Sequence, residues 1–201
     1  MSDVEPLRLD ALLKREIDLF FREVAEGRLE IYNEISLQLE LGIFLRRTLT
    51  DLKILFENPV DHFGWSRTLF SKKREIDISV VSPDKTLKAA IELKFPRNGQ
   101  HPETMFKACQ DLEFLEEIAR QGSALGLFVM VVEDRLFYEG GSDELIYKYF
   151  RKSVPITGLI RKPTGKKDEE AKLRSEYRIN WNAVIGRMKY CTVPVSSLAA
   201  A

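Results

Sequence analysis

Cysteine and histidine are scarce in this chain of 201 residues, which contains two of each. Cys109 and Cys191 lie far apart and form no CxxC pattern, which argues against a zinc site built from cysteine and histidine. No apolar run approaches the roughly 18 residues that a transmembrane helix needs. The N-terminus also lacks the basic and apolar segments of a secretory signal. We therefore expect a cytoplasmic protein in a reducing compartment, without contact to membranes.

The chain also lacks an excess of charge, because its 31 basic residues balance 31 acidic ones. Residues 148–190 nevertheless hold twelve basic and four acidic side chains, a net charge of +8 that residues 1–147 offset with −8. This basic third predicts a polyanionic partner such as nucleic acid. A solvated surface balanced by acidic neighbours in the fold explains the pattern equally well. The phosphate-binding candidates in this segment are Lys162, Lys166, Lys167 and Lys172.

Apolar residues make up 44% of the sequence, which is enough for a sizeable core in a single domain over residues 1–201. Periodicity and turn residues predict helices over 7–25, 30–48, 103–121 and 142–151, and strands over 52–59, 74–81, 88–95, 125–132, 176–181 and 187–194. This order predicts an α/β fold, a three-layer sandwich in which helices flank a mixed central sheet. The expected organisation is an N-terminal helix (1–29), a core (30–133) and a basic C-terminal elaboration (134–195) with a loop over 161–172.

The clearest local pattern is a β-hairpin over residues 74–95, with turn residues at 82–86. In the register whose paired residue numbers sum to 169, one face is apolar throughout, with Ile76 opposite Leu93, Ile78 opposite Ile91 and Val80 opposite Ala89. A slip by one residue would oppose apolar to polar side chains, so we expect this register, without a bulge. On the other face it places Asp77 opposite Glu92, with their Cβ atoms about 5 Å apart.

Two carboxylates that face each other repel, and burial under helices makes their charge still less favourable. A divalent cation would compensate them, and a pair of oxygen ligands with open positions for water suits Mg²⁺ or Mn²⁺. At least one carboxyl of the pair is expected to have a raised pKa. The alternative is a solvated sheet edge at which Lys94, two residues after Glu92, neutralises one charge.

Asp77, followed by Glu92-Leu93-Lys94 at the end of a hairpin strand, resembles the motif of the PD-(D/E)XK, or restriction-endonuclease-like, nuclease superfamily. Residues 30–133 are similar to the core of that superfamily, which consists of a helix, three strands, a helix and a further strand. The resemblance implies that Asp77, Glu92 and the backbone carbonyl of Leu93 hold Mg²⁺ or Mn²⁺. It also implies that Lys94 orients the attacking water or stabilises the transition state.

The match departs from the written motif at one position, where Ile76 precedes the aspartate. The literal Pro83-Asp84 cannot substitute, because Asp84 lies at the turn, roughly 25 Å along the strand from Glu92. Gln110 on the next helix is similar to the Gln of the Q-x-x-x-Y element in the RecB-like branch, with Phe114 in place of Tyr. The resemblance implies that Gln110 supports the site. The alternative is an ordinary polar position on an amphipathic helix.

A glutamate on the expected helix over 30–48 is a further candidate metal ligand. Glu40 lies in an apolar stripe of this helix, where a glutamate needs a partner. Many superfamily members place a first-helix glutamate near the metal, so the resemblance implies this role for Glu40. Glu34 on the same helix is its rival, and Glu57 on the first strand is a weaker candidate.

These features predict metal-dependent phosphodiester hydrolysis of nucleic acid, with DNA favoured over RNA. Lys72, Lys73 and Arg74 precede the first hairpin strand and are expected to contact phosphates, as is the 161–172 loop. No separate reader domain is recognisable, so the sequence does not predict whether cleavage is sequence-specific, and a homodimer is compatible with the sequence. The alternatives are a catalytically inactive binding protein of the same fold and an unrelated protein whose basic third docks an acidic partner.

Overall fold

The computed structural model describes residues 6–97, 99–122, 124–141, 144–165 and 168–196. Its helices are α1 (Pro6–Ala25), α2 (Glu34–Thr48), α3 (His101–Gln121) and α4 (Tyr147–Arg151). Its strands are β1 (Lys53–Pro59), β2 (Glu75–Val81), β3 (Leu87–Lys94), β4 (Leu125–Val132), β5 (Ile156–Arg161), β6 (Glu170–Tyr177), β7 (Asn182–Ala183) and β8 (Lys189–Val195). Short 3-10 helices span Val60–Phe63, Arg67–Leu69 and Arg135–Phe137. Among the described residues, no helix combines the length and apolar character needed to cross a membrane.

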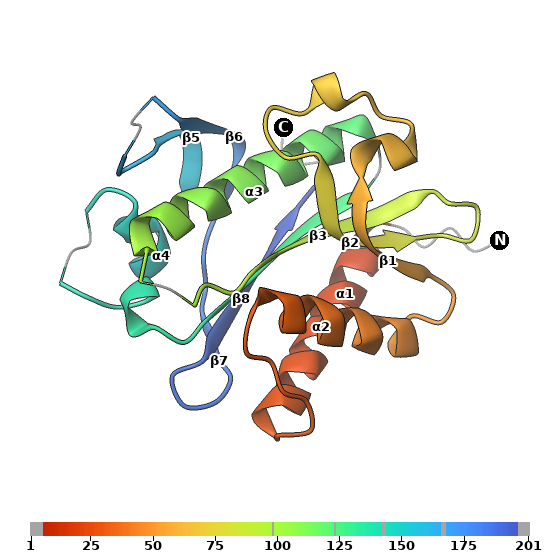
Figure 1. Cartoon of the computed structure of the whole chain (residues 1–201), viewed down its shortest axis with the longest axis horizontal. Helices are drawn as coiled ribbons and strands as arrows, with labels where there is room; N and C mark the ends of the chain where they lie inside the picture. Colours follow the sequence, from red (N-terminus) through yellow and green to blue (C-terminus); the bar gives the residue numbers. More distant parts are fainter. Residues whose placement is uncertain (1–5, 98, 123, 142–143, 166–167, 197–201) are drawn as a thin grey trace.

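Within the described residues, six strands form one sheet in the order β1-β2-β3-β4-β8-β7. The β3–β4 pair is parallel and the other pairs are antiparallel, so the sheet is mixed, as predicted. Figure 1 shows α1 and α2 on one side of this sheet and α3 on the other. The protein is therefore an α/β fold with helices on both faces of a central sheet.

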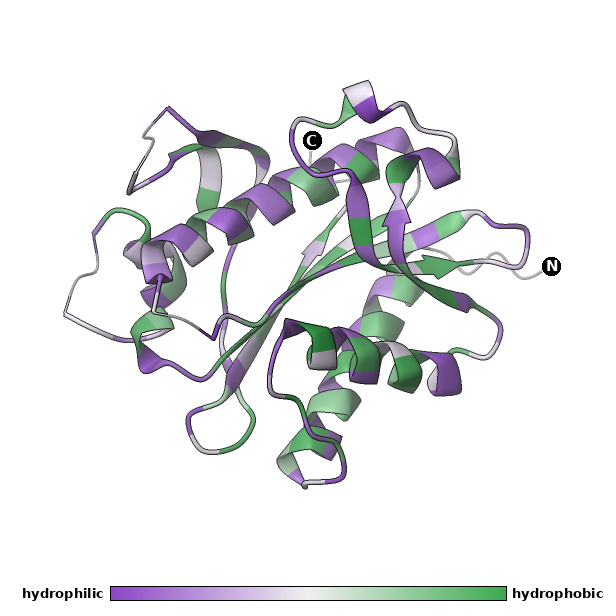
Figure 2. Ribbon diagram, viewed as in Figure 1, coloured by the Kyte–Doolittle hydropathy of each residue, from purple (hydrophilic) through white to green (hydrophobic). Residues whose placement is uncertain are grey.

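Strand β4 divides the hydrophobic core into two layers. Leu127 and Val129 pack with α1 and α2, whereas Phe128 and Met130 face the layer that contains α3. Every residue of β4 is buried, as expected for a continuous apolar strand between two helical layers. Figure 2 shows the matching bands of hydrophobic and hydrophilic residues along α3. The sheet is thus held rigidly between helices, which positions the side chains at the ends of its strands.

The start of α2 is set by local hydrogen bonds. Asn33 and Ser36 form a capping box, in which the Ser36 amide donates to Asn33 Oδ1 (2.8 Å) and the Asn33 amide donates to Ser36 Oγ (3.0 Å). The helix consequently begins at Glu34, four residues later than the periodicity predicts. This cap places the first turn of α2 beside the ends of β2 and β3.

The predicted hairpin register is confirmed for Ile78 opposite Ile91 and Val80 opposite Ala89. A bulge follows, and Val81 lies opposite Leu87, so the expectation of a bulge-free hairpin is wrong. The bulge lies on the turn side of the hairpin. At the other end the paired residues stop at Ile78 and Ile91, the residues adjacent to Asp77 and Glu92.

The C-terminal third differs most from the predicted elements. The expected loop over 161–172 is shorter than predicted, because β5 ends at Arg161 and β6 begins at Glu170, and the strand expected over 176–181 begins six residues earlier. These two strands form the hairpin β5–β6, separate from the central sheet. Its high charge conceals an alternation in which Ala171, Leu173 and Tyr177 are buried against α3 while the lysines and arginines between them are exposed. The predicted helix over 142–151 begins at Tyr147, and residues 142–143 lie outside the described residues.

Candidate active site

Asp77 on β2 and Glu92 on β3 lie side by side on one face of the sheet, as the hairpin register predicts. Regular pairing gives way here to side-chain hydrogen bonds: the Leu93 amide donates to Asp77 Oδ2 (2.8 Å), and the Asp77 amide donates to Glu92 Oε1 (3.4 Å). Glu92 is fully buried and the Asp77 side chain is 14% exposed. Asp84, in contrast, lies at the hairpin turn, where it accepts from the Thr86 amide (3.2 Å).

The electrostatics of the pair follow from its burial. Burial raises the pKa of Glu92 well above its usual range, and the Asp77 carboxylate raises it further. The ammonium of Lys73 offsets part of this rise. The prediction that at least one carboxyl of the pair has a raised pKa is confirmed.

The cation that compensates the pair comes from an unexpected residue. Lys73, in the segment before β2, places its Nζ 2.7 Å from Asp77 Oδ1 and in contact with Glu92 Oε2. Burial lowers the pKa of Lys73, but Glu92 and Asp77 outweigh this effect and raise it above the usual range. The sequence predicts that Lys73 contacts phosphate, whereas its ammonium here binds the two carboxylates.

Lys94 lies next to the pair but has different direct partners. Its Nζ is 2.9 Å from Asp111 Oδ2 and 3.9 Å from Glu34 Oε1, and it donates to the Leu93 carbonyl (3.0 Å). Burial lowers the pKa of Lys94, but the carboxylates of Asp111 and Glu34 raise it above its usual range. Lys94 is therefore a largely buried, protonated ammonium linked to Asp111 rather than to Asp77 or Glu92.

Asp111 on α3 is a site residue that sequence analysis overlooks. Burial raises its pKa, while Lys94 and Lys73 lower it. Gln110, the neighbouring residue that the resemblance implies, is half-buried and forms none of the side-chain hydrogen bonds described at the site. One signal does point to Asp111: it shares a helix face with Ala108 and Leu115, so an aspartate there needs a partner.

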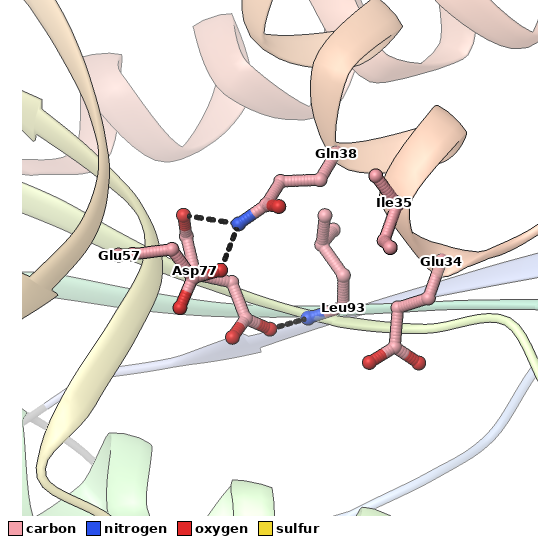
Figure 3. Close-up of a pocket in the computed structure, with 6 residues that line it drawn as sticks. All are labelled: Glu34, Ile35, Gln38, Glu57, Asp77 and Leu93. Carbon is pink, nitrogen blue, oxygen red and sulfur yellow. Dashed lines mark hydrogen bonds between the residues drawn. The ribbon is translucent and has the colours of Figure 1, made fainter.

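The carboxylate that α2 contributes is Glu34, not Glu40. Glu34 Oε2 accepts from the Phe95 amide (3.0 Å), and Glu34 lines a small pocket with Ile35, Gln38, Glu57, Asp77 and Leu93 (Figure 3). Glu40 does not line this pocket. It lies one turn before Phe44, whose ring contacts Phe20 of α1 (5.7 Å between centroids), so this side of α2 faces α1. Glu40 is half-buried, and none of the contacts described at the acidic pair involves it, so its role in a metal shell stays a prediction.

Glu57 adds a strained position to the pocket. The pairs Phe56–Ile78 and Asn58–Ile76 flank it, which places Glu57 beside Asp77 on the neighbouring strand. Its φ of 51° lies in the left-handed region, which is unfavourable for a residue other than glycine. Gln38 Nε2 donates both to Glu57 Oε1 and to the Asp77 carbonyl (2.8 Å), as Figure 3 shows. Gln38 thereby ties α2 to the backbone of the acidic pair.

The predicted phosphate-binding residues have varied surroundings. Lys72 contacts the Glu170 carbonyl and lies 3.5 Å from Glu113, and Arg74 donates to the Lys73 carbonyl (3.2 Å). Lys162 is mostly buried between Glu103 (3.2 Å) and Glu169 (3.1 Å), so acidic neighbours balance its charge. Lys172 is exposed, and Lys166 and Lys167 lie outside the described residues.

The arrangement offers hard oxygen donors for a metal. Asp77, Glu92 and the Leu93 carbonyl supply two carboxylates and a carbonyl, a donor set that suits Mg²⁺ or Mn²⁺. The Lys73 ammonium already bridges the two carboxylates, which demonstrates that one cation fits between them. No group of three or more histidine, cysteine, aspartate or glutamate side chains within the described part of the chain is arranged to hold a metal. A metal here would therefore need the backbone carbonyl and water as further ligands.

Comparisons with known proteins identify no relative of this chain: no family model matches the sequence, no curated protein matches it and no solved structure matches the fold.

Proposed function

We infer that the protein is a metal-dependent nuclease that hydrolyses phosphodiester bonds, with DNA favoured over RNA as the substrate. The observation that carries this inference is the juxtaposition of Asp77 and Glu92 on adjacent strand ends, with Lys94 two residues further on. The succession α2, β1, β2, β3, α3, β4 supports a restriction-endonuclease-like core. The two free, buried cysteines agree with a reducing, cytoplasmic location.

In this mechanism Asp77, Glu92 and the Leu93 carbonyl would hold Mg²⁺ or Mn²⁺. The metal would lower the pKa of a bound water and offset negative charge on the phosphate. Lys94 stays protonated because Asp111 and Glu34 raise its pKa, so it is suited to stabilise developing negative charge rather than to accept a proton. Asp111 positions Lys94 through their ion pair. Gln38 keeps the Asp77 backbone and Glu57 in place.

One observation favours a second candidate, a catalytically inactive member of the same fold that binds nucleic acid or protein. Lys73 already binds both carboxylates and offsets part of their charge, so the pair has a cation without a metal. In such a protein the pair and Lys73 would be a structural ion-pair cluster. The two candidates differ in one measurable property, which is cleavage that requires a divalent cation.

The test is incubation of fluorescently labelled single-stranded DNA, duplex DNA and RNA with the protein and Mg²⁺ or Mn²⁺. We expect cleavage that chelation abolishes and that Asp77→Asn reduces about a thousandfold, as loss of a metal ligand should. Glu40→Gln is the matched control, since Glu40 lies outside the pocket on the same helix as Glu34. Absence of cleavage on every substrate would favour the inactive binder. Full activity of Asp77→Asn would show that the cleavage does not depend on the acidic pair and would refute the proposed site.

A further inference from the structure

The acidic pair uses its four carboxylate oxygens in two different ways. Asp77 Oδ2 and Glu92 Oε1 accept backbone amides, from Leu93 (2.8 Å) and Asp77 (3.4 Å) respectively. Asp77 Oδ1 and Glu92 Oε2 are both bound by the Lys73 ammonium. The two oxygens that remain for a cation are therefore the same two that Lys73 occupies.

Lys73 can leave these oxygens without a change in the backbone. Its side chain is 28% exposed, whereas that of Lys94 is 15% exposed and Glu92 is fully buried. The segment that carries Lys73 is pinned on both sides, because the Ser71 amide donates to Glu117 and the Arg74 carbonyl accepts from the Val60 amide (2.8 Å). Rotation about the lysine side-chain bonds is then sufficient to carry the ammonium from the pair toward solvent.

We propose that Lys73 is a displaceable internal cation, which fills the metal position when the site is empty and becomes a phosphate-binding residue when a divalent metal takes its place. The proposal rests on the proposed function in one respect, namely that Asp77 and Glu92 bind the metal. A divalent cation and the ammonium cannot share the same two oxygens at contact distance, because like charges repel strongly in a buried site. Metal entry consequently frees a protonated amine at the edge of the site, where an anionic phosphate would bind it.

The competition has a direct consequence for metal affinity. The metal binds only the fraction of molecules whose acidic pair is not occupied by Lys73, which weakens its apparent affinity by that fraction. Removal of the ammonium should therefore tighten metal binding, although it leaves the empty site less stable. A lysine that merely supports the fold would show the loss of stability without the gain in affinity.

The decisive experiment is Mn²⁺ titration of the full chain by isothermal calorimetry, without nucleic acid. We expect Lys73→Met to lower the Kd for Mn²⁺ by about tenfold or more relative to wild type. Lys72→Met is the matched control, because it removes the same charge at the neighbouring position. Lys72 contacts Glu113 and the Glu170 carbonyl and not the acidic pair. Its Kd should stay within about twofold of wild type. An unchanged or weaker affinity of Lys73→Met, or no Mn²⁺ binding to either protein, would overturn the proposal.

A measurement on the wild-type protein covers the case in which Lys73→Met does not fold. Acylation of lysines by an N-hydroxysuccinimide ester, mapped by peptide mass spectrometry, reports the accessibility of each amine. Mn²⁺ should increase acylation of Lys73 and leave that of Lys72 unchanged. Equal labelling of Lys73 with and without bound Mn²⁺ would contradict displacement.

These outcomes separate the inference from the proposed function. Tighter Mn²⁺ binding by Lys73→Met without any cleavage of nucleic acid would support the displaceable cation in a protein that is not a nuclease. Metal-dependent cleavage combined with equal Mn²⁺ affinities would support the nuclease and refute the role of Lys73.

Discussion

The protein buries carboxylates in two regions, and their partners differ. On α3, Glu113, Glu116 and Glu117 accept backbone amides from other segments, which are those of Lys172 (3.1 Å), Arg174 (3.0 Å), Ser175 (2.9 Å) and Ser71 (3.1 Å). The acidic pair of Asp77 and Glu92 instead shares the side-chain ammonium of Lys73. A backbone amide cannot leave its acceptor unless the segment unfolds, whereas a lysine side chain can rotate away. The α3 carboxylates therefore act as structural clamps, which hold neighbouring segments of the chain against α3. At the acidic pair, in contrast, another cation can replace the Lys73 ammonium.

Acidic residues within the fold offset part of the basic charge of the C-terminal third. The basic hairpin β5–β6 packs against the acidic side of α3, where Glu113 and Glu116 hold the backbone of β6. Lys162 is likewise paired with Glu103 and Glu169. Part of the charge that predicts a polyanionic partner is thus satisfied inside the molecule. Phosphate binding by this hairpin remains a prediction for its exposed residues, such as Lys172.

The largest expected effect is on the rate of cleavage, which should depend on the acidic pair and not on the α3 carboxylates. Glu92→Gln should reduce metal-dependent cleavage about a thousandfold, equivalent to ~4 kcal/mol of transition-state stabilisation. Glu116→Gln, an equally isosteric change of a buried glutamate, should leave the rate within a few-fold of wild type because Glu116 contacts β6 and not the pair. Steady-state cleavage assays measure both rates. Comparable losses in the two variants would mean that the acidic pair has no special role in catalysis.

The effect on stability should be larger at the α3 carboxylates than at the acidic pair. Glu116→Ala should lower the free energy of unfolding by about 3 kcal/mol, because the buried amides of Arg174 and Ser175 and the Tyr177 hydroxyl lose a charged acceptor. Urea unfolding followed by circular dichroism measures this change. Glu176→Ala, an exposed position on β6, is the control and should change little. A loss below about 1 kcal/mol for Glu116→Ala would show that the clamp is dispensable.

Lys73→Met should have an intermediate effect on stability that depends on metal. Without metal we expect a loss of about 2 kcal/mol, since the buried Glu92 and the largely buried Asp77 lose a partly exposed cation. Mn²⁺ should restore most of this stability by binding the folded state. Thermal unfolding of Lys73→Met and Lys72→Met with and without Mn²⁺ provides the measurement. A metal-independent loss in Lys73→Met would place Lys73 in the same structural class as the α3 clamps.

The smallest expected effect is a pH dependence at Glu117. Burial raises the pKa of Glu117 above its ordinary value of 4.5, although the Ser71 hydrogen bonds lower it in part. A carboxyl with a raised folded-state pKa contributes stability that is present below its ordinary pKa and lost as the pH rises through the folded-state pKa. The stability of wild type relative to Glu117→Gln should therefore fall as the pH rises from the ordinary pKa of 4.5 through the raised pKa of the folded state. Urea midpoints across this range measure it, and a parallel pair of profiles would exclude the effect.

Several features of the candidate site follow from local pattern alone. The hairpin alternation places Asp77 and Glu92 on one face, because side chains alternate strictly along paired strands. The identity of the partners is not local. Lys73, Asp111 and Glu34 reach the site from a loop and two helices, and their positions depend on how each helix is rotated against the sheet.

The choice between Glu34 and Glu40 illustrates this limit. Both lie on α2, and a polar residue in an apolar stripe is a reasonable sign of a buried partner. Phe44, in the stripe that contains Glu40, packs against Phe20 of α1, and the periodicity of α2 does not distinguish a contact with α1 from a contact with the sheet. The capping box at Asn33, in contrast, is readable from sequence and sets where Glu34 lies in the first turn.

The sequence by itself determined the class of fold, the buried central strand and the facing carboxylates, because these depend on short-range periodicity that a single chain segment contains. Only the tertiary structure decided which cation sits between those carboxylates, which helix face meets the sheet and where the basic hairpin packs. These outcomes depend on packing between segments distant in sequence. When a helix rotates about its axis by the angle between two consecutive residues, a different side chain faces the sheet.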